Sequence, residues 1–417
     1  MPGRNVPDNM WRIVEPSHWP DPAAWNSFSA LLRLEQCPRR WALSNASYPG
    51  LWDGKGYPQK LHLAAIEGTI VHSTVEVLIK HLVQKNSVTR TETGITQVLR
   101  EIGGYTRLVQ SQIDVALKPF NQNPRTVTHI DRIRQQLIAK LPELRFQVQT
   151  FVSQLSPVSG RPKPYQSLPG GNREHGALPI GAHMEVTLET PELRWRGVVD
   201  LLVLSESSAE ITDFKTGEIK SEHEFQIRTY ALLWMRDKKR NPHQRVVSRL
   251  LISYPTRSVE VPVPTDSELA LLEAELRSRT ESAQSECVRR PPRARPDEDA
   301  CKWCEVRHLC GEYWEALRDW FPTTHAPDQV RHDIQLRLTS RSALTSWTAI
   351  VEESSSLERE ALVTVRFPLD DYHEFQEGQS LRLLDVHISY VQGVDTTDIP
   401  AISVGVSSET FVYGDGP

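Results

Sequence analysis

The chain of 417 residues is predicted to form a mixed α/β domain followed by a small β-rich domain. In the middle of the chain, short apolar runs rich in β-branched residues alternate with helical patterns, which is typical of a sheet flanked by helices. From residue 321 onward, five short β-rich runs are separated by polar turns, as in a small barrel such as an OB-fold. The length also exceeds the roughly 250–300 residues at which single cores tend to divide, so two or three domains are expected.

The clearest local signal is a β-hairpin between residues 197 and 217. Its strands are predicted over Val198–Leu204 and Ala209–Lys215, and the residues between them are mostly serine, which favours a turn. The first strand is apolar apart from one aspartate, which favours burial of the hairpin. The alternative is a hairpin that carries its polar side chains on a solvent-exposed face.

The register of this hairpin determines which side chains meet. If Leu204 pairs with Ala209, Asp200 lies opposite Asp213, and Lys215 lies on the same face as Asp213 because side chains alternate along a strand. Two carboxylates brought together need a cation between them, and hard oxygen ligands suit Mg²⁺ or Mn²⁺. The hairpin therefore predicts a divalent-metal site with a lysine beside it.

Other elements are predicted on both sides of the hairpin. Strands are expected over Met184–Leu193, Val246–Tyr254 and Ser258–Val263, and helices over Leu61–Lys85, Glu222–Arg236 and Asp266–Gln284. A helix capped by Ser29 should end or kink at Pro38. Polar helical patterns between about residues 88 and 155 predict an inserted helical subdomain, and a Pro/Gly-rich loop follows over Ser156–Leu178. Residues 1–26, rich in Pro and Trp, are expected to form an irregular N-terminal arm.

Three side chains on the predicted helices are candidates for a site. His72 lies on the apolar stripe of its helix, close to Gly68, which costs about 1 kcal/mol in a helix unless something packs against it. Gln226 and Tyr230 stand four residues apart on one helical face. A buried, hydrogen-bonded histidine and a polar edge on a packed helix are the alternatives.

The cysteines form a split set. Cys301, Cys304 and Cys310 lie within ten residues, and three close cysteines need a fourth ligand, for which Cys37 and Cys287 are the distant candidates. A single zinc ion is one interpretation, although the spacing matches neither a paired zinc ribbon nor a zinc finger. Just before this set, four arginines stand among prolines, and they form either a solvated loop or a weak nucleic-acid surface: Arg289, Arg290, Arg293 and Arg295.

Charge and hydropathy limit the possible partners. The net charge is −5, but residues 321–417 alone carry −9 and contain no lysine, so the part upstream of them is the one that suits a polyanion. No apolar run reaches the roughly 18 residues of a membrane span, and the N-terminus lacks the apolar core of a signal peptide. A cytoplasmic protein without a membrane partner is expected.

Taken in order, these motifs resemble the PD-(D/E)xK nuclease superfamily, and within it the RecB-type branch that carries an iron–sulfur cluster. The resemblance covers roughly residues 27–315, and the nuclease domain it implies is expected over residues 27–320, with the acidic tail outside it. It rests on five features: GTIVH around His72, GVVD ending at Asp200, DFKTG with Asp213 and Lys215, QIRTY with Gln226 and Tyr230, and the split cysteines. It implies a restriction-endonuclease-like mixed sheet flanked by helices.

The resemblance also implies roles. His72, Asp200, Asp213 and the Phe214 carbonyl would hold Mg²⁺ or Mn²⁺, Lys215 would act on the attacking water, and Gln226 and Tyr230 would steady the lysine or the DNA. Cys37, Cys301, Cys304 and Cys310 would hold a 4Fe-4S cluster.

The leading function is therefore a metal-dependent DNA nuclease acting on single strands or ends. The alternatives are a structural DNA-binding subunit of a helicase–nuclease or defence complex, and a zinc-stapled RNA-processing enzyme. The tail, residues 321–417, is expected to contact protein, either the nuclease domain itself or a partner such as a helicase, because its charge opposes binding to phosphates.

Overall fold

The computed structural model of the chain describes residues 11–52, 55–84, 92–154, 176–320, 331–368, 375–391, 399–405 and 407–414. The chain divides into two compact units. We call residues 23–32 and 60–284 the sheet unit, and residues 1–22, 33–59 and 285–417 the cysteine unit. This division does not follow the predicted boundary at residue 320, because residues 285–320 group with the tail.

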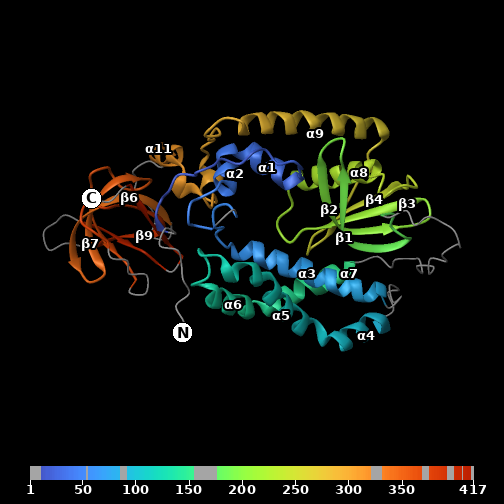
Figure 1. The fold of residues 1–417 in the computed structure, drawn as a ribbon. Coiled ribbons are helices and arrows are strands. Elements are labelled where there is room, and N and C mark those ends of the chain that lie inside the picture. Colours follow the sequence, from blue (N-terminus) through green and yellow to red (C-terminus); the bar gives the residue numbers. More distant parts are fainter. Residues whose placement is uncertain are drawn as a thin grey trace. The chain divides into compact units, whose positions relative to one another are not determined.

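The sheet unit contains a five-stranded mixed sheet in the order β1-β2-β3-β4-β5 (Figure 1). Its strands are β1 (Gly181–Thr190), β2 (Trp195–Leu204), β3 (Ser208–Phe214), β4 (Val246–Ser253) and β5 (Ser258–Val261). Neighbouring strands are antiparallel except β3 and β4, which run parallel. A parallel pair needs a crossover, and helix α8 (Ser221–Arg236) supplies it. The predicted mixed α/β core is therefore confirmed.

Helix α8 packs closely on β2 because of one glycine. A Cβ atom at Gly197 would lie 2.7 Å from Tyr230 Cε1 and 3.0 Å from Leu233 Cδ1, so only glycine fits there without displacing the helix. This close approach explains the first residue of the GVVD motif in physical terms. It fixes the distance between the sheet and the side chain of Tyr230.

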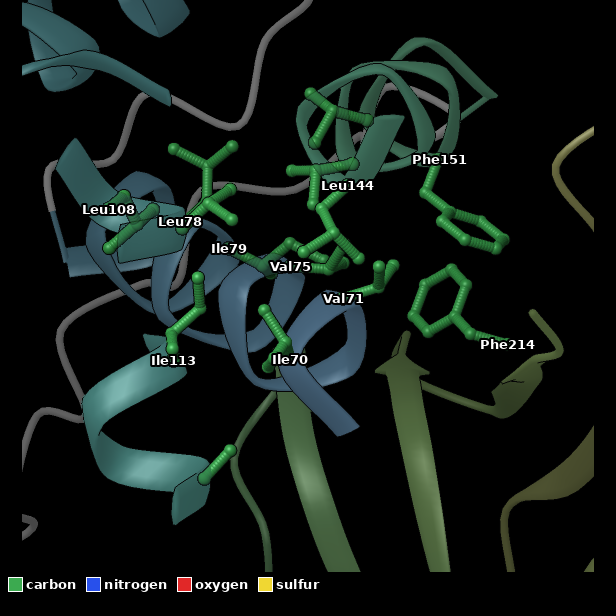
Figure 2. Close-up of a cluster of buried hydrophobic side chains, with 14 of the residues drawn as sticks. Ile70, Val71, Val75, Leu78, Ile79, Leu108, Ile113, Leu144, Phe151 and Phe214 are labelled. Carbon is green, nitrogen blue, oxygen red and sulfur yellow. The ribbon is translucent and has the colours of Figure 1, made fainter. Parts of the chain in front are cut away.

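Helix α3 (Leu63–Gln84) lies between the sheet and the inserted helices (Figure 1). The insertion consists of α4 (Glu92–Ile102), α5 (Gly104–Leu117), η2 (Lys118–Gln122), α6 (Ile130–Ala139) and α7 (Leu141–Gln154). Side chains from α3, α5 and α7 form one buried cluster, and Phe214 of β3 joins it through a T-shaped contact with Phe151 at 5.5 Å (Figure 2). The helical insertion is thus part of the same core as the sheet. The loop predicted over Ser156–Leu178 lies almost wholly outside the described residues.

The helical segment predicted from Ser29 onward is interrupted at Cys37. Helix α1 spans Phe28–Gln36, and α2 spans Pro38–Asn45. Pro38 occupies the first turn of α2, where its missing N–H costs nothing, so the predicted break is confirmed. The predicted cap of α1 was wrong: Ser27 Oγ, and not Ser29, accepts the Ala30 N–H at 3.3 Å. Ser27 precedes the first helical residue, which is where a capping side chain reaches the free N–H groups.

The cysteine unit contains helices α10 (Glu298–Cys301), η3 (Arg307–Leu309) and α11 (Gly311–Trp320), beside the barrel strands. Six strands are described there: β6 (His332–Ala343), β7 (Ser346–Ser354), β8 (Leu362–Arg366), β9 (Ser380–Val391), β10 (Ile399–Ser403) and β11 (Glu409–Tyr413). Five of them close into a ring, since β10 pairs with β8 in parallel and with β9 in antiparallel fashion. The predicted small barrel is confirmed in this coarse sense.

The last of the five predicted β-rich runs, residues 402–413, covers parts of two strands, β10 and β11. Asp385 in β9 has a positive φ of 57°, and the pairing of β6 with β9 shifts register next to it. Such an irregularity bends a strand. The half of β9 before Asp385 pairs with β11, and the half after it pairs with β10.

Buried polar contacts join the barrel to the cysteine-bearing segment of the same unit. Arg307 Nε lies 2.5 Å from Asp333 Oδ2, and Arg307 Nη2 lies 3.0 Å from Asp385 Oδ1. The Tyr313 hydroxyl also donates to Asp333 at 2.7 Å. Arg382 donates to the carbonyl of His308 at 2.5 Å. These contacts attach β6 and β9 to residues 301–320.

Residues 11–22 of the N-terminal arm also belong to this unit. Residue Ile13 donates its backbone N–H to the Val412 carbonyl at 2.8 Å, and the Trp11 ring lies 5.9 Å from that of Phe411. The arm is irregular, as predicted, but it is packed against β11. Separately, none of the helices in the described part of the chain is long and apolar enough to cross a membrane.

We predict that Arg307→Gln destabilises the barrel of the cysteine unit by about 3–5 kcal/mol, because Asp333 would keep its buried charge without its cationic partner. Hydrogen exchange of the β6 and β9 amides measures the free energy of local opening. The matched control is Arg337→Gln, since Arg337 pairs with Glu352 at 3.5 Å and is 45% exposed, and its loss should cost less than about 1 kcal/mol. Equal exchange rates in both variants would contradict the prediction.

Candidate active site

The β2–β3 hairpin has the predicted register. Leu204 pairs with Ala209, and Leu201 pairs with Thr212. The next position along this ladder places Asp200 opposite Asp213. The Phe214 backbone N–H donates to Asp200 Oδ2 at 2.6 Å, which holds that carboxylate against β3.

The buried side chain of Phe214 determines the face of the sheet on which its neighbours Asp213 and Lys215 lie. Its side chain is buried in the helical cluster, facing Phe151 (Figure 2). Because side chains alternate along a strand, Asp213 is directed to the opposite face of the sheet, and Lys215 follows beyond the end of β3. Lys215 Nζ lies 2.7 Å from Asp213 Oδ2, an ion pair whose geometry leaves that buried oxygen without a directed hydrogen bond. The structure therefore places Asp213 beside Lys215, with Asp200 near both charges.

His72 reaches the same place from helix α3. Its Nδ1 lies 3.7 Å from Asp200 Oδ2. Burial lowers the pKa of His72, and the Lys215 charge adds to this, while Asp213 and the Phe214 backbone act in the opposite direction. The imidazole is therefore kept neutral, which is the form that binds a metal.

Gly68, one turn before His72, allows the lysine loop to approach α3. A Cβ at this position would lie 2.9 Å from Thr216 Oγ1, next to Lys215 in sequence. This close contact explains why Gly68 is found inside a helix, although glycine destabilises helices. The approach fixes the relative position of the histidine helix and the lysine loop.

Gln226 and Tyr230 line the site from α8. Gln226 Nε2 donates to the Tyr230 hydroxyl at 2.7 Å. Burial raises the pKa of Tyr230 far above its usual value, and the charges of Asp213 and Asp200 add to the effect. Tyr230 therefore stays a neutral hydrogen-bonding group beside the carboxylates.

The two aspartates carry the largest electrostatic cost. Asp213 is 2% exposed, and burial is the main cause that raises its pKa. Burial also raises the pKa of Asp200 well above its usual range, and the charge of Asp213 raises it further. Lys215 acts against both shifts. Carboxyl groups with shifted pKa values are common at functional sites.

Sequence reasoning missed a third carboxylate, Glu185 of β1. Its neighbours Met184 and Val186 pair with Leu201 and Val199, so Glu185 lies at the register position opposite Asp200. It has a positive φ of 52°, which is uncommon for a residue other than glycine. Partial burial raises its pKa, with the charges of Glu76 and Asp213 adding to the rise.

A signal for Glu185 was present in the sequence. The short turn over residues 191–194 lets Thr190 pair with Trp195, and this register leads directly to Glu185 opposite Asp200. Glu185, Asp200 and Asp213 therefore occupy one row across β1, β2 and β3. We call this set the carboxylate row.

The donor set fits a hard divalent cation. It offers carboxylate oxygens, a neutral imidazole and the nearby Phe214 backbone, which are ligands that Mg²⁺ and Mn²⁺ accept. The buried Asp213 oxygen without a directed hydrogen bond is an acceptor that such an ion would satisfy. Among the described residues, however, no three His, Cys, Asp or Glu side chains are drawn together tightly enough to form a ready metal-binding group.

The four cysteines of the predicted set line one pocket of the cysteine unit, with Arg39, Arg40 and Tyr313 beside them. Cys37 Sγ accepts the Arg40 N–H at 3.4 Å, and Cys301 Sγ accepts the Asp297 N–H at 3.5 Å. Burial raises the pKa of Cys304 and of Cys310 to about 12 each. Cys287 is buried and is not among the residues that line this pocket.

The four arginines of the proline-rich loop are all exposed. Arg290 lies 3.3 Å from Asp21, and Arg295 donates to the Glu35 carbonyl at 2.5 Å, so these two also help to hold the loop in place. A weak nucleic-acid surface formed by the four arginines stays a prediction.

No curated protein matches the sequence. Two solved structures show limited similarity. The crystal structure of SSO0001 is 18% identical over 31% of this chain and 60% of that chain, with a TM-score of 0.20. A murine DNA-binding protein bound to double-stranded DNA is 12% identical over 56% of this chain and 94% of that chain, with a TM-score of 0.15.

A family match covers a much larger share of the chain. Residues 26–311 match the family described as the PD-(D/E)XK nuclease superfamily. The matched range includes His72, the hairpin with Asp200 and Asp213, helix α8 and the cysteine set. The chain therefore belongs to the PD-(D/E)XK nuclease superfamily.

Proposed function

We propose that the protein is a metal-dependent DNA nuclease that hydrolyses phosphodiester bonds of single strands or strand ends. The observation that carries this proposal is the carboxylate row, with Lys215 2.7 Å from Asp213 and His72 3.7 Å from Asp200. A buried group of acids beside a lysine suits a reaction in which a cation offsets the charge of a phosphate.

The proposed metal ligands are His72, Asp200, Asp213 and the Phe214 carbonyl, with Glu185 at the edge of the row. A bound Mg²⁺ or Mn²⁺ would lower the pKa of a water ligand and polarise the scissile phosphate. Asp200 is held in place by the Phe214 N–H, and burial keeps His72 neutral. These residues thus present oxygen and nitrogen donors from three separate elements.

Lys215 is proposed to orient the attacking water or, as the neutral amine, to deprotonate it. As a compact cation fixed beside Asp213, it would stabilise the negative charge of the transition state. Gln226 and Tyr230 are joined by a hydrogen bond of 2.7 Å. They are proposed to steady the lysine or the DNA strand from helix α8.

We also propose that the chain belongs to the RecB-type branch and that Cys37, Cys301, Cys304 and Cys310 hold a 4Fe-4S cluster. Support comes from the single pocket that all four line and from the backbone N–H groups that point at two of the sulfurs. Such N–H···S bonds are one of the features that tune protein clusters. The thiols would close around the cluster as it binds, since binding sites for metals are rarely formed in advance.

The five-stranded ring is proposed to be an OB-type barrel that contacts protein. Its support is the closed ring of β6–β10 and the net charge of −9 over residues 321–417, which opposes phosphate binding. The buried contacts of Arg307 and Tyr313 with Asp333 support this proposal, since they join the barrel to residues 301–320 within the cysteine unit.

The first prediction tests the catalytic site. The purified chain should cut single-stranded DNA with Mg²⁺ or Mn²⁺ and stop when EDTA is added. Asp213→Ala and Lys215→Ala should each lower kcat by at least about 100-fold, since each removes a charge that acts in the transition state. Asp131→Ala and Lys238→Ala, at exposed positions of the sheet unit, are the controls and should cut normally. Undiminished cutting by either site variant would contradict the proposal.

The second prediction tests the close packing of α3 on the lysine loop. Gly68→Ala should lower kcat/KM by about tenfold to a hundredfold, because the new methyl group displaces Thr216 and with it Lys215. Thr216→Ala removes the hydroxyl that the methyl group meets, so the double variant should recover most of the lost activity. A double variant as impaired as Gly68→Ala alone would exclude this explanation.

The third prediction concerns the cysteines. Protein purified without oxygen should be brown and contain about four iron atoms per chain. Cys37→Ser should lower the iron content and the melting temperature, whereas Cys287→Ser should leave the iron content unchanged, because Cys287 is not among the residues that line the pocket. Iron analysis and visible absorption provide the measurement. One zinc ion per colourless chain would favour the zinc alternative.

A further inference from the structure

A pair of polar side chains lies beside Lys215 and has no part in the proposed metal chemistry. His223 stands in the first turn of α8, and Tyr254 follows the last residue of β4. The His223 Nδ1 and the Tyr254 hydroxyl oxygen are 2.8 Å apart. Tyr254 is only 2% exposed, whereas His223 is half-buried. The histidine is therefore the member of the pair that a ligand can reach.

The sheet places this pair next to the lysine. In the parallel ladder of β3 and β4, Phe214 pairs with Ser253, and the Lys215 N–H donates to the Ser253 carbonyl at 2.8 Å. The next position of the ladder brings Tyr254 beside Lys215. Through its contact with His223, the hydroxyl group of Tyr254 links the first turn of α8 to the end of this ladder.

Helix α8 independently places His223 on the face that lines the site. His223, Gln226 and Tyr230 are spaced i, i+3 and i+7, so they share one helical face. Burial decreases along this row, from Tyr230 at 6% exposure to the half-buried Gln226 and His223. His223 is therefore the most exposed end of this row together with Gln226, and it lies one turn closer to the start of α8.

The contact with Tyr254 bears on the tautomer of His223. A buried tyrosine hydroxyl needs an acceptor for its proton, and His223 Nδ1 lies 2.8 Å from it, so we assign the phenol as donor and Nδ1 as acceptor. An imidazole that accepts at Nδ1 carries its proton at Nε2. Burial lowers the pKa of His223, and the charge of Lys215 lowers it further. The result is a neutral ring with a fixed N–H donor on its free side.

We propose that His223 binds the substrate strand by donating its Nε2–H to a phosphodiester oxygen next to the scissile phosphate. This inference rests on the proposed nuclease function and assigns a substrate-positioning role within that site. A neutral N–H donor suits this position. It adds a hydrogen bond to the phosphate and leaves the carboxylate row as the site that binds the divalent cation. The residue positions the strand and takes no part in the chemical step.

The test compares variants that keep different nitrogen atoms of the ring. In His223→Gln the amide nitrogen replaces Nε2, whereas in His223→Asn it replaces only Nδ1. His223→Ala and His223→Asn should raise KM for a single-stranded oligonucleotide about tenfold or more and change kcat less than about twofold, because a hydrogen bond to a charged group is lost. His223→Gln should stay within about threefold of the wild-type KM.

Two further variants complete the comparison. Tyr254→Phe retains the packed ring but frees the tautomer of His223, and it should raise KM about threefold. His243→Ala changes an exposed histidine of the same unit and should leave both constants unchanged. Unaltered KM in His223→Ala, or Asn performing as well as Gln, would overturn the proposal. A fall in kcat at constant KM would do the same.

A modified substrate identifies the phosphate. Neutral methylphosphonates are placed one at a time on either side of the scissile bond, and KM is measured for the wild type and for His223→Ala. At one position the modification should weaken the wild type about tenfold and have no further effect on the variant, since both changes remove the same hydrogen bond. Additive losses at every position would contradict the assignment.

A binding measurement separates this inference from the proposed function. Fluorescence anisotropy of the same oligonucleotide in EDTA requires no cutting. If the wild type cuts no strand but His223→Ala binds about tenfold more weakly, the nuclease proposal fails and the strand contact stands. If the wild type cuts and both proteins bind equally with equal KM, the His223 proposal fails and the nuclease proposal stands.

Discussion

Glu185, Asp200 and Asp213 occupy one row of register positions across three strands, and the burial of their charges is the main electrostatic cost of this site, with repulsion on Glu185 and Asp200 from Asp213 adding to it. Burial raises the pKa of both aspartates, which means that the protein resists carrying both charges at once. Lys215 offsets part of this cost from 2.7 Å. A divalent cation would offset more, so the row is stable in its charged form only with cationic partners.

The surrounding fold keeps these groups from moving apart. Phe214 is buried between the two charged residues of its motif, so neither can turn away from the row. Two close approaches, of Thr216 to Gly68 and of Tyr230 to Gly197, fix α3 and α8 relative to the sheet. The glycines of the GTIVH and GVVD motifs are therefore packing residues, whose absent side chains let α3 approach Thr216 and let α8 approach β2.

The sequence allowed the local part of this site to be predicted, because a hairpin register follows from a short turn and an alternating pattern. Asp200 and Asp213 were placed opposite each other on that basis, and the ladder agrees. Glu185 was missed since its place depends on the pairing of a second hairpin. Likewise, β9 pairs with β11 before Asp385 and with β10 after it, an irregularity that no apolar pattern shows. The attachment of the tail through Asp333 depends on long-range contacts and was not predictable from periodicity.

The central claim is that the carboxylate row and His72 form one metal centre. An anomalous difference map of crystals grown with Mn²⁺ tests it most directly, because the ion itself is located. The account predicts a peak at a coordination distance of about 2 Å from Asp200, Asp213 and His72. A map with no peak at the row, or with Mn²⁺ bound only elsewhere in the chain, would contradict it.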